Sequence, residues 1–255
     1  MKAKKATITD AQLLRHKALF ESSEEMEQML NEFIFPKETL NNILIELVQE
    51  KNSLNAEQTV DKIKKLVCSK DADPNVIIDK SAGATALMIA CSKGKHRIVC
   101  TLLEINADPN MKDSKGQSAI FYAFDDRIEG INILASLLEK GVDIDIENND
   151  GFSPLFVAIT KGNYKCVRQL LQKNPKKKTL DKNRENILHY AVKSHENRLE
   201  LCNAILEECP NDFFFLPGKC GKKPYEYSND IDFANYLKGI EQKLLVLLST
   251  EHKQY

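Results

Sequence analysis

Cysteines and histidines are the residues of this chain best suited to metal binding or nucleophilic catalysis. His96 and Cys100 stand four positions apart in an expected helix, a spacing that can place two metal ligands on one face. The sequence fixes no further ligand nearby, so we expect an edge histidine, a packed cysteine and no bound metal. A cysteine nucleophile paired with His189 or His195 is the alternative, an enzyme whose site is assembled from scattered residues. The odd count of seven cysteines, most of them in apolar helical patterns, favours reduced, buried thiols in a cytosolic compartment.

Two lysine-rich segments could bind anions. The segment Gly218-Lys-Cys-Gly221-Lys-Lys is superficially similar to a phosphate loop, but it lacks the spacing and the hydroxyl residue after the lysine, so we expect a turn. A solvated loop is expected for the second segment, with an acidic partner surface or phosphate groups as the alternative. Its lysines are Lys173, Lys176, Lys177, Lys178 and Lys182. No aromatic residues interleave with them, which disfavours single-stranded nucleic acid.

Other catalytic motifs are missing from the sequence. It contains no glycine-rich dinucleotide or nucleotide motif, no zinc-protease motif and no serine-hydrolase elbow. We therefore predict no catalytic residue, no cofactor and no enzymatic activity.

Composition bounds the class of protein. With 255 residues, 42% hydrophobic and 29% charged, the chain can bury a core. Its 36 basic and 37 acidic residues leave a net charge of -1, which provides no global field for nucleic acid or an anionic membrane. Uncharged stretches such as 83–92 fall far below the roughly 18 apolar residues of a spanning helix. A polar stretch follows the basic start, so we expect no export signal of the general secretory type and a cytoplasmic location.

An internal repeat provides the elements that must position these residues. Four segments align, and each has an alanine in the same place, at steps of 33, 35 and 33 residues. These alanines are Ala90, Ala123, Ala158 and Ala191. A weaker fifth copy begins at Gly221, and Leu66-Val67 marks one more unit on the N-terminal side. Each unit is expected to form a helix, a turn, a second helix ending in an apolar doublet, and an extended loop.

The start of each first helix has its own signal. Thr85, Ser118 and Ser153 stand where an N-cap hydroxyl can accept from free backbone N–H groups, and Pro154 occupies a first-turn position that tolerates proline. The small alanines allow the first helix to approach its neighbour closely.

With these features the sequence resembles the ankyrin-repeat family. The turns Asp113-Ser-Lys-Gly116 and Asn148-Asn-Asp-Gly151, the segments Thr85-Ala-Leu-Met88 and Ser153-Pro-Leu-Phe156, and a glycine after the first helix match that family's pattern. The chain departs from it in lacking the turn glycine at Arg184. The resemblance implies an all-α solenoid of about five to six helix-turn-helix units.

The expected domain organisation follows from the repeat. Residues 1–34 should form one or two amphipathic helices that cap the array, and residues 239–255 a C-terminal helix and tail. Residues 35–238 should hold the repeats, at 35–78, 79–112, 113–147, 148–180, 181–217 and 218–238.

The resemblance also implies where a partner would bind. Ankyrin arrays generally hold proteins, and the contact positions are the turn tips and the exposed ends of first helices on the concave face. Carried over by alignment, these are Ser81, Ser92, Lys93, Ser114, Lys115, Tyr122, Asp125, Asp126, Asn149, Phe152, Thr160, Lys161, Lys182, Asn183, Lys193 and Ser194. Phe152 and Tyr122 are the expected anchors. We thus predict a monomeric, non-enzymatic interaction scaffold whose partner is a protein, with no nucleic acid and no membrane insertion.

Two further interpretations remain open. Residues 35–47 are similar to the opening of an F-box, which would make the chain a ubiquitin-ligase adaptor; we favour a first repeat helix with Leu40, Ile43, Leu44 and Leu47 as its core stripe. The lack of tryptophan, the divergent repeats and the polar C-terminus also resemble ankyrin-type effectors that intracellular bacterial pathogens inject through type IV secretion. In that case the partner is a host protein and the location the host cytoplasm.

Overall fold

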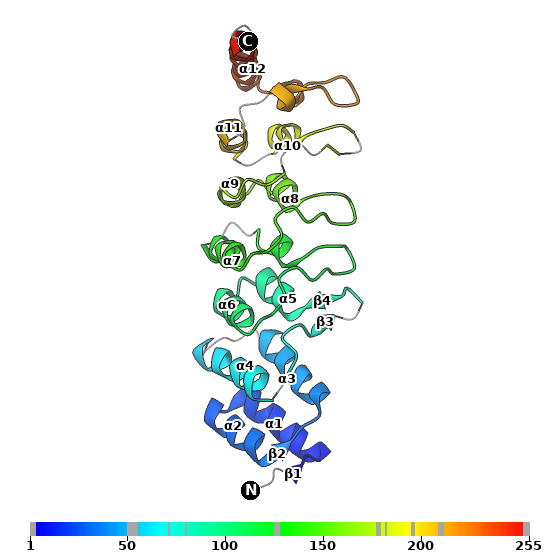
Figure 1. Ribbon diagram of the computed structural model, residues 1–255, viewed down its shortest axis with the longest axis vertical. Helices are drawn as coiled ribbons and strands as arrows, with labels where there is room; N and C mark the ends of the chain where they lie inside the picture. Colours follow the sequence, from blue (N-terminus) through cyan, green and yellow to red (C-terminus); the bar gives the residue numbers. More distant parts are fainter. Residues whose placement is uncertain are drawn as a thin grey trace. The chain divides into compact units, whose positions relative to one another are not determined.

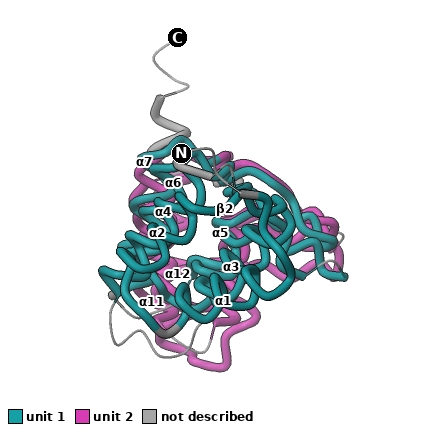
Figure 2. The backbone as a smooth tube through the Cα atoms, turned by 90° about the horizontal axis from the view of Figure 1, so that it is seen from below, with its two compact units in different colours: residues 1–142 teal, residues 143–255 magenta. Residues whose placement is uncertain are grey.

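The chain folds into two compact units, residues 1–142 (unit 1) and residues 143–255 (unit 2), which Figure 2 distinguishes by colour. The computed structural model describes residues 4–49, 56–70, 72–79, 81–124, 128–176, 180–181, 183–194, 197–208 and 212–251. Both units are built from pairs of helices.

Unit 1 stacks its helix pairs in two rows. The pairs are α1 (Ile8–Phe20) with α2 (Ser23–Glu32), α3 (Lys37–Gln49) with α4 (Ala56–Lys70), α5 (Ala86–Ser92) with α6 (His96–Glu104), and the 3₁₀ helix η1 (Ala119–Tyr122) with α7 (Ile128–Glu139). The first members contact one another in order, from α1 through α3 and α5 to η1, and we call them the first row. The second members, from α2 through α4 and α6 to α7, form the second row (Figure 1).

Unit 2 continues the same pattern within itself. Its pairs are α8 (Pro154–Thr160) with α9 (Tyr164–Leu171), α10 (Ile187–Lys193) with α11 (Arg198–Glu208), and the 3₁₀ helix η3 (Pro224–Tyr227) with α12 (Ile231–Glu251). Its first row runs from α8 through α10 to η3, and α9 contacts α11 in the second row. A further 3₁₀ helix, η2 (Asp212–Phe215), packs against α10 and α12. The expected all-α fold of helix-turn-helix units is confirmed.

Strands are very short in the described residues. β1 (Lys4–Lys5) pairs in parallel with β2 (Phe33–Ile34), and β3 (Ile77–Asp79) pairs antiparallel with β4 (Ala84–Thr85) just before α5. These ladders only shape the ends of helices and one turn.

The repeating alanines and apolar doublets form the core between the rows. All four alanines of the repeat column are completely buried, which lets first-row helices approach closely, as expected. Doublet residues such as Leu102, Leu137 and Leu170 are also fully buried.

Helix starts follow the expected cap chemistry at two of the three predicted positions. The hydroxyl of Thr85 accepts from the backbone N–H of Met88 at 3.3 Å, and that of Ser153 accepts from Phe156 at 3.4 Å. The prediction for Ser118 is wrong. In the tighter 3₁₀ helix η1, the N–H of Phe121 donates to the backbone carbonyl of Ser118, which leaves the buried hydroxyl with no hydrogen-bond partner.

The loops after the second-row helices are tied together by Asx side chains. In unit 1 the amide oxygen of Asn75, in the loop after α4, accepts from the N–H of Asp108, in the loop after α6, at 2.7 Å. Asn41 of helix α3 accepts from the N–H of Asp73 at 2.9 Å and holds the first of these loops to its own repeat. In unit 2 the carboxylate of Asp145 accepts from Lys176 at 2.7 Å. Each loop is therefore positioned by its neighbour, and the turn tips gain a fixed spacing within each unit.

The N-terminal helices complete the stack of unit 1. Helix α1 contacts α3, and α2 contacts α4. The apolar side chains Leu14, Met26 and Leu30 are at most 1% exposed. Lys62 of α4 donates to the carbonyl of Glu21 at 2.7 Å, at the C-terminal end of α1.

The segment similar to an F-box is the first-row helix α3. Leu40, Ile43, Leu44 and Leu47 are at most 3% exposed. Helix α3 packs against α1, α4 and α5, so this apolar stripe already serves the core of unit 1. The burial supports the interpretation as a repeat helix.

At the other end, α12 runs unbroken through residues 238 and 239, where the sequence analysis placed a boundary. Its buried face carries Phe233 and Leu237. Among the described residues, no helix combines the length and the apolar character that a membrane span requires.

Candidate protein-interaction surface

Unit 2 contains a continuous strip of aromatic side chains along its first row, in which Phe156 is buried and the other rings are half-buried. Phe152 stacks on Phe156 with ring centroids 4.7 Å apart and an interplanar angle of 13°. Tyr190 meets Phe156 edge to face at 4.3 Å, and the ammonium of Lys193 lies 5.5 Å from the Tyr190 ring and 4.1 Å from the Tyr227 ring. We call Phe152, Phe156, Tyr190, Lys193 and Tyr227 the aromatic strip. It joins all three repeats of unit 2, because its members lie on α8, α10 and η3 or next to them.

Acidic residues of the turns fix the tyrosines of the first row. The carboxylate of Asp181 accepts from the N–H groups of Asn183 and Glu185 and from the Tyr190 hydroxyl at 2.8 Å. In unit 1 the carboxylate of Asp113 accepts from the Tyr122 hydroxyl at 2.5 Å. Burial, followed by the bond to the carboxylate, raises the pKa of both tyrosines. These hydroxyls therefore stay neutral donors that lock turn to helix.

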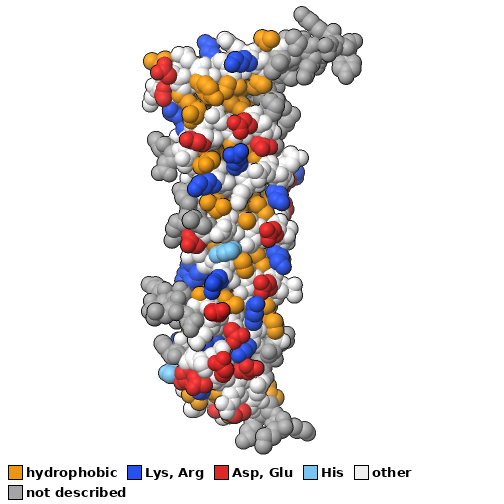
Figure 3. All heavy atoms as spheres, turned by 90° about the vertical axis from the view of Figure 1, so that its left-hand side faces the viewer, with side chains coloured by type: hydrophobic (Ala, Val, Ile, Leu, Met, Phe, Trp, Pro, Cys, Tyr) orange, Lys and Arg blue, Asp and Glu red, His pale blue; other side chains and the backbone are white. Residues whose placement is uncertain are grey.

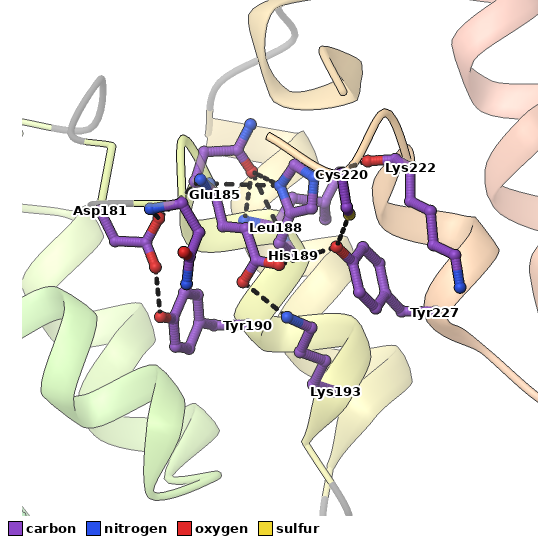
Figure 4. A network of polar contacts seen from close by, with 11 residues as sticks. Asp181, Glu185, Leu188, His189, Tyr190, Lys193, Cys220, Lys222 and Tyr227 are labelled. Atoms are coloured by element: carbon purple, nitrogen blue, oxygen red, sulfur yellow. Dashed lines mark hydrogen bonds and ion pairs between the residues drawn. The ribbon is translucent and has the colours of Figure 1, made fainter. Parts of the chain in front are cut away.

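A second network surrounds the buried carboxylate of Glu185 (Figure 4). The side chain of Glu185 is 8% exposed; it pairs with the Lys193 ammonium at 2.5 Å and accepts from the Tyr227 hydroxyl at 2.8 Å. The exposed thiol of Cys220 lies 2.8 Å from that hydroxyl. Tyr227 has one proton for two acceptors, so Glu185 and a Cys220 thiolate compete for it. Hydrogen bonding from Tyr227 lowers the pKa of Cys220.

His189 is a structural residue of this network. It is completely buried, its Nδ1 lies 3.0 Å from the amide oxygen of Asn186, and its Nε2 lies 3.4 Å from the carbonyl of Lys222. Burial lowers the pKa of His189. Its hydrogen-bonding partners in the described part of the chain are Asn186 and the backbone carbonyl of Lys222, and its ring meets that of Tyr227 edge to face at 5.8 Å. His195 lies outside the described residues. The geometry thus gives the cysteine–histidine hypothesis no support.

The predicted contact positions lie mainly at the surface. Six are in unit 1 (Ser81, Ser92, Lys93, Ser114, Lys115 and Tyr122), and seven are in unit 2 (Asn149, Phe152, Thr160, Lys161, Asn183, Lys193 and Ser194). Tyr122, Phe152 and Ser194 are half-buried and the others are exposed. The remaining three, Asp125, Asp126 and Lys182, lie outside the described residues.

Several of these side chains donate hydrogen bonds to backbone carbonyls within their own unit. The ammonium of Lys93 donates to the carbonyl of Gln49 at 2.8 Å at the C-terminal end of α3. The hydroxyls of Ser92 and Thr160 donate to carbonyls of their own helices. Phe152 packs on Phe156 within the aromatic strip.

The other candidate metal-binding and anion-binding groups were His96 with Cys100, the turn at Gly218, and the lysine cluster. His96 Nε2 lies 3.3 Å from Cys100 Sγ and 3.1 Å from Ser136 Oγ, a hydrogen-bonded group on α6 and α7. Over the described residues, no cluster of three His, Cys, Asp or Glu could hold a metal ion.

The backbone N–H groups of Gly218, Lys219 and Gly221 donate to carbonyl oxygens, so this turn does not offer them to a phosphate. In the basic cluster, Lys177, Lys178 and Lys182 lie outside the described residues.

The second-row side of each unit has a different character. Lysine, arginine and carboxylate side chains alternate there with apolar ones, and carboxylates gather over α2 and α4 in unit 1 (Figure 3). Lys65 pairs there with Glu27 at 2.8 Å and with Asp61 at 3.0 Å. This exposed charge mosaic is typical of a solvated surface.

Sequence reasoning missed Glu185, Tyr190, Cys220 and Tyr227. One signal was available for Tyr190, because it follows Asp181 by nine residues, as Tyr122 follows Asp113. Nothing in the sequence marks Glu185 as a buried carboxylate or brings it to Tyr227, 42 residues away.

Known proteins share the repeat and cover parts of this chain. The family model described as ankyrin repeats matches residues 52–148 and 127–213. The phosphocholine transferase AnkX of Legionella pneumophila is 30% identical over 62% of this chain and 17% of its own length. The NF-kappa-B inhibitor delta of Mus musculus is 26% identical over 46% of this chain and 42% of its own length, and human Rabankyrin-5 is 27% identical over 45% and 10%. The chain thus spans less than half of each of these relatives.

Proposed function

The chain belongs to the ankyrin-repeat family, and from this premise we propose that it is a non-enzymatic module that holds a partner protein on the first-row side of its repeats. The contact positions would be the turn tips and first-helix ends predicted from the sequence. The aromatic strip of unit 2 would form the centre of the interface.

The observation that carries this proposal is the strip itself. Aromatic side chains supply large contact area at low entropic cost and carry much of the free energy in protein interfaces. Here their positions are set before binding, since Asp181 holds Tyr190 and Glu185 holds both Lys193 and Tyr227. A preorganised surface loses less conformational entropy when a partner binds.

Proximity labelling followed by titration of the purified partner tests the proposal. Phe152→Ala and Lys161→Ala alter the first-row side of unit 2, whereas Leu199→Ala and Lys165→Ala are matched changes on exposed second-row positions. We expect the first pair together to weaken binding by about tenfold or more, because truncation of an interface anchor costs about 1.4 kcal/mol or more. The second pair should leave the dissociation constant unchanged.

Phe152→Ala also removes a ring that stacks on Phe156, so the titration should be run well below the unfolding temperature of the variant. A partner that binds the first-row variant as tightly as the wild type, or that is lost only with the second-row variant, would contradict the proposal.

A more specific role, in which the partner is a host protein of an intracellular bacterium, is our second proposal. It is supported by the divergent repeats and by the partial similarity to the Legionella protein, whose named transferase activity belongs to that protein. A translocation reporter fused to the chain should enter host cells only when the type IV apparatus is intact, and deletion of residues 249–255 should abolish entry. Entry without the apparatus would refute this role.

A further inference from the structure

A hollow beside the aromatic strip combines an apolar floor with an acidic rim. It lies in unit 2 and has a volume of about 300 Å³. Its floor is formed by Phe152, Phe156 and Leu180, and its rim by Glu147, Asp150 and Asp181. No lysine or arginine is among the lining residues in the part of the chain that the structure describes.

The floor is rigid and aromatic. Phe152 and Phe156 stack nearly parallel, and the edge of Tyr190 braces Phe156 at 4.3 Å. Leu180 is 45% exposed, which leaves apolar area uncovered at the side of the hollow. This floor can take the flat or aliphatic part of an incoming side chain.

The rim is held in place by the turns. Asp181 is fixed by two backbone N–H groups and by the Tyr190 hydroxyl, and its carboxylate keeps acceptor capacity for a further donor. Asp150 is exposed, and its N–H donates to the amide oxygen of Asn148 at 3.0 Å, which sets the turn that carries it. The hollow therefore offers negative charge at defined positions.

We propose that this hollow receives an arginine side chain of the partner protein, an inference that rests on the proposed interaction function. A guanidinium group is planar, stacks on aromatic rings and is more weakly hydrated than an ammonium group. It also carries several N–H donors that match carboxylate oxygens. An apolar side chain would leave the rim carboxylates desolvated without partners, and an anion would be repelled.

The test is a titration of the full chain with N-acetylarginine methylamide, followed by backbone amide chemical shifts. The neutral probe is the citrulline analogue, which keeps the planar shape and three N–H donors but lacks the charge and carries a carbonyl oxygen in place of one nitrogen. We expect saturable shifts at Gly151 and Phe152 with the arginine probe and none with citrulline. Asp150→Asn should weaken arginine binding by about two- to fivefold, as expected for an exposed ion pair. Asp232→Asn, at an exposed carboxylate of α12, should not change it.

Three results would overturn the inference: no shift at Gly151 and Phe152, equal shifts with the citrulline analogue, or equally tight binding of a third probe, the corresponding lysine derivative Nα-acetyllysine methylamide. The probe reports on the hollow without any partner protein. A negative titration therefore rejects the arginine site and leaves the proposed partner binding untouched. A failed search for a partner bears on the proposed function and does not affect the titration.

Discussion

Two serines at equivalent starts of first-row helices should respond in opposite ways to the same substitution. Ser153 caps α8 through a hydrogen bond from Phe156 at 3.4 Å, whereas the Ser118 hydroxyl is fully buried without a partner. Removing an N-cap hydroxyl lowers the free energy of unfolding by about 1 kcal/mol. A buried hydroxyl that lacks a hydrogen bond costs roughly 1–3 kcal/mol, so its removal is neutral or stabilising.

We therefore expect Ser153→Ala to destabilise its unit by about 1 kcal/mol, and Ser118→Ala to leave the stability unchanged or to raise it by up to about 1 kcal/mol. Urea unfolding followed by circular dichroism measures both values, with the dependence of the free energy of unfolding on urea concentration held the same for all variants. Thr85→Ala provides a second capped position, within unit 1. The exposed Ser114→Ala is the control for the substitution itself. If Ser118→Ala destabilises as much as Ser153→Ala, the hydroxyl of Ser118 does form a cap, and the account of η1 is wrong.

Three other predictions concern unit 2. Arg184 has a left-handed φ of +58° where related turns carry glycine, so Arg184→Gly should raise the free energy of unfolding by about 1 kcal/mol; a loss of stability in urea would contradict this. Burial lowers the pKa of His189 below 6.5. The free energy of unfolding therefore keeps the full contribution of the neutral histidine above pH 6.5 and loses it as the pH falls toward the lowered pKa. His189→Leu should therefore flatten the acid limb of stability measured by urea unfolding between pH 7 and 5, and an unchanged slope would argue against a buried neutral histidine. A hydrogen bond from Tyr227 lowers the pKa of Cys220, so its exposed thiol should react with a disulfide reagent at neutral pH faster than the exposed thiol of Cys68. Tyr227→Phe should slow the reaction of Cys220, and equal rates in the wild type and this variant would refute the contact.

The repeating parts of the fold could be predicted because each repeat provides the same signals in the same places. The alanine column steps by 33, 35 and 33 residues, and the apolar doublets and the caps at Thr85 and Ser153 follow the same repeat. Packing between neighbouring repeats then amplifies a weak local preference. Where the repeat diverges the prediction fails. The four-residue η1 replaces a full first helix, and Ser118 then loses its role although its residue type fits the pattern.

The site was predictable only in outline. Turn tips and first-helix ends are set by the repeat, so their exposure at positions such as Asn149 and Lys161 could be anticipated. The hydrogen bond of Tyr227 to Glu185 joins two repeats, and no local pattern indicates which carboxylate will be buried. Phe152 could be recognised as an aromatic residue near the surface, but its place in the floor of a hollow depends on Phe156 and Leu180.

Hydrogen exchange of the purified chain, with and without its captured partner, maps the surface that the partner covers. We expect slower exchange on binding in residues 148–161 and 183–194, which carry the turns and first-row helices of unit 2, with little change in the second-row helices α9 and α11. Protection confined to α9 and α11, with unchanged exchange in the first-row segments, would contradict the assignment of the partner surface.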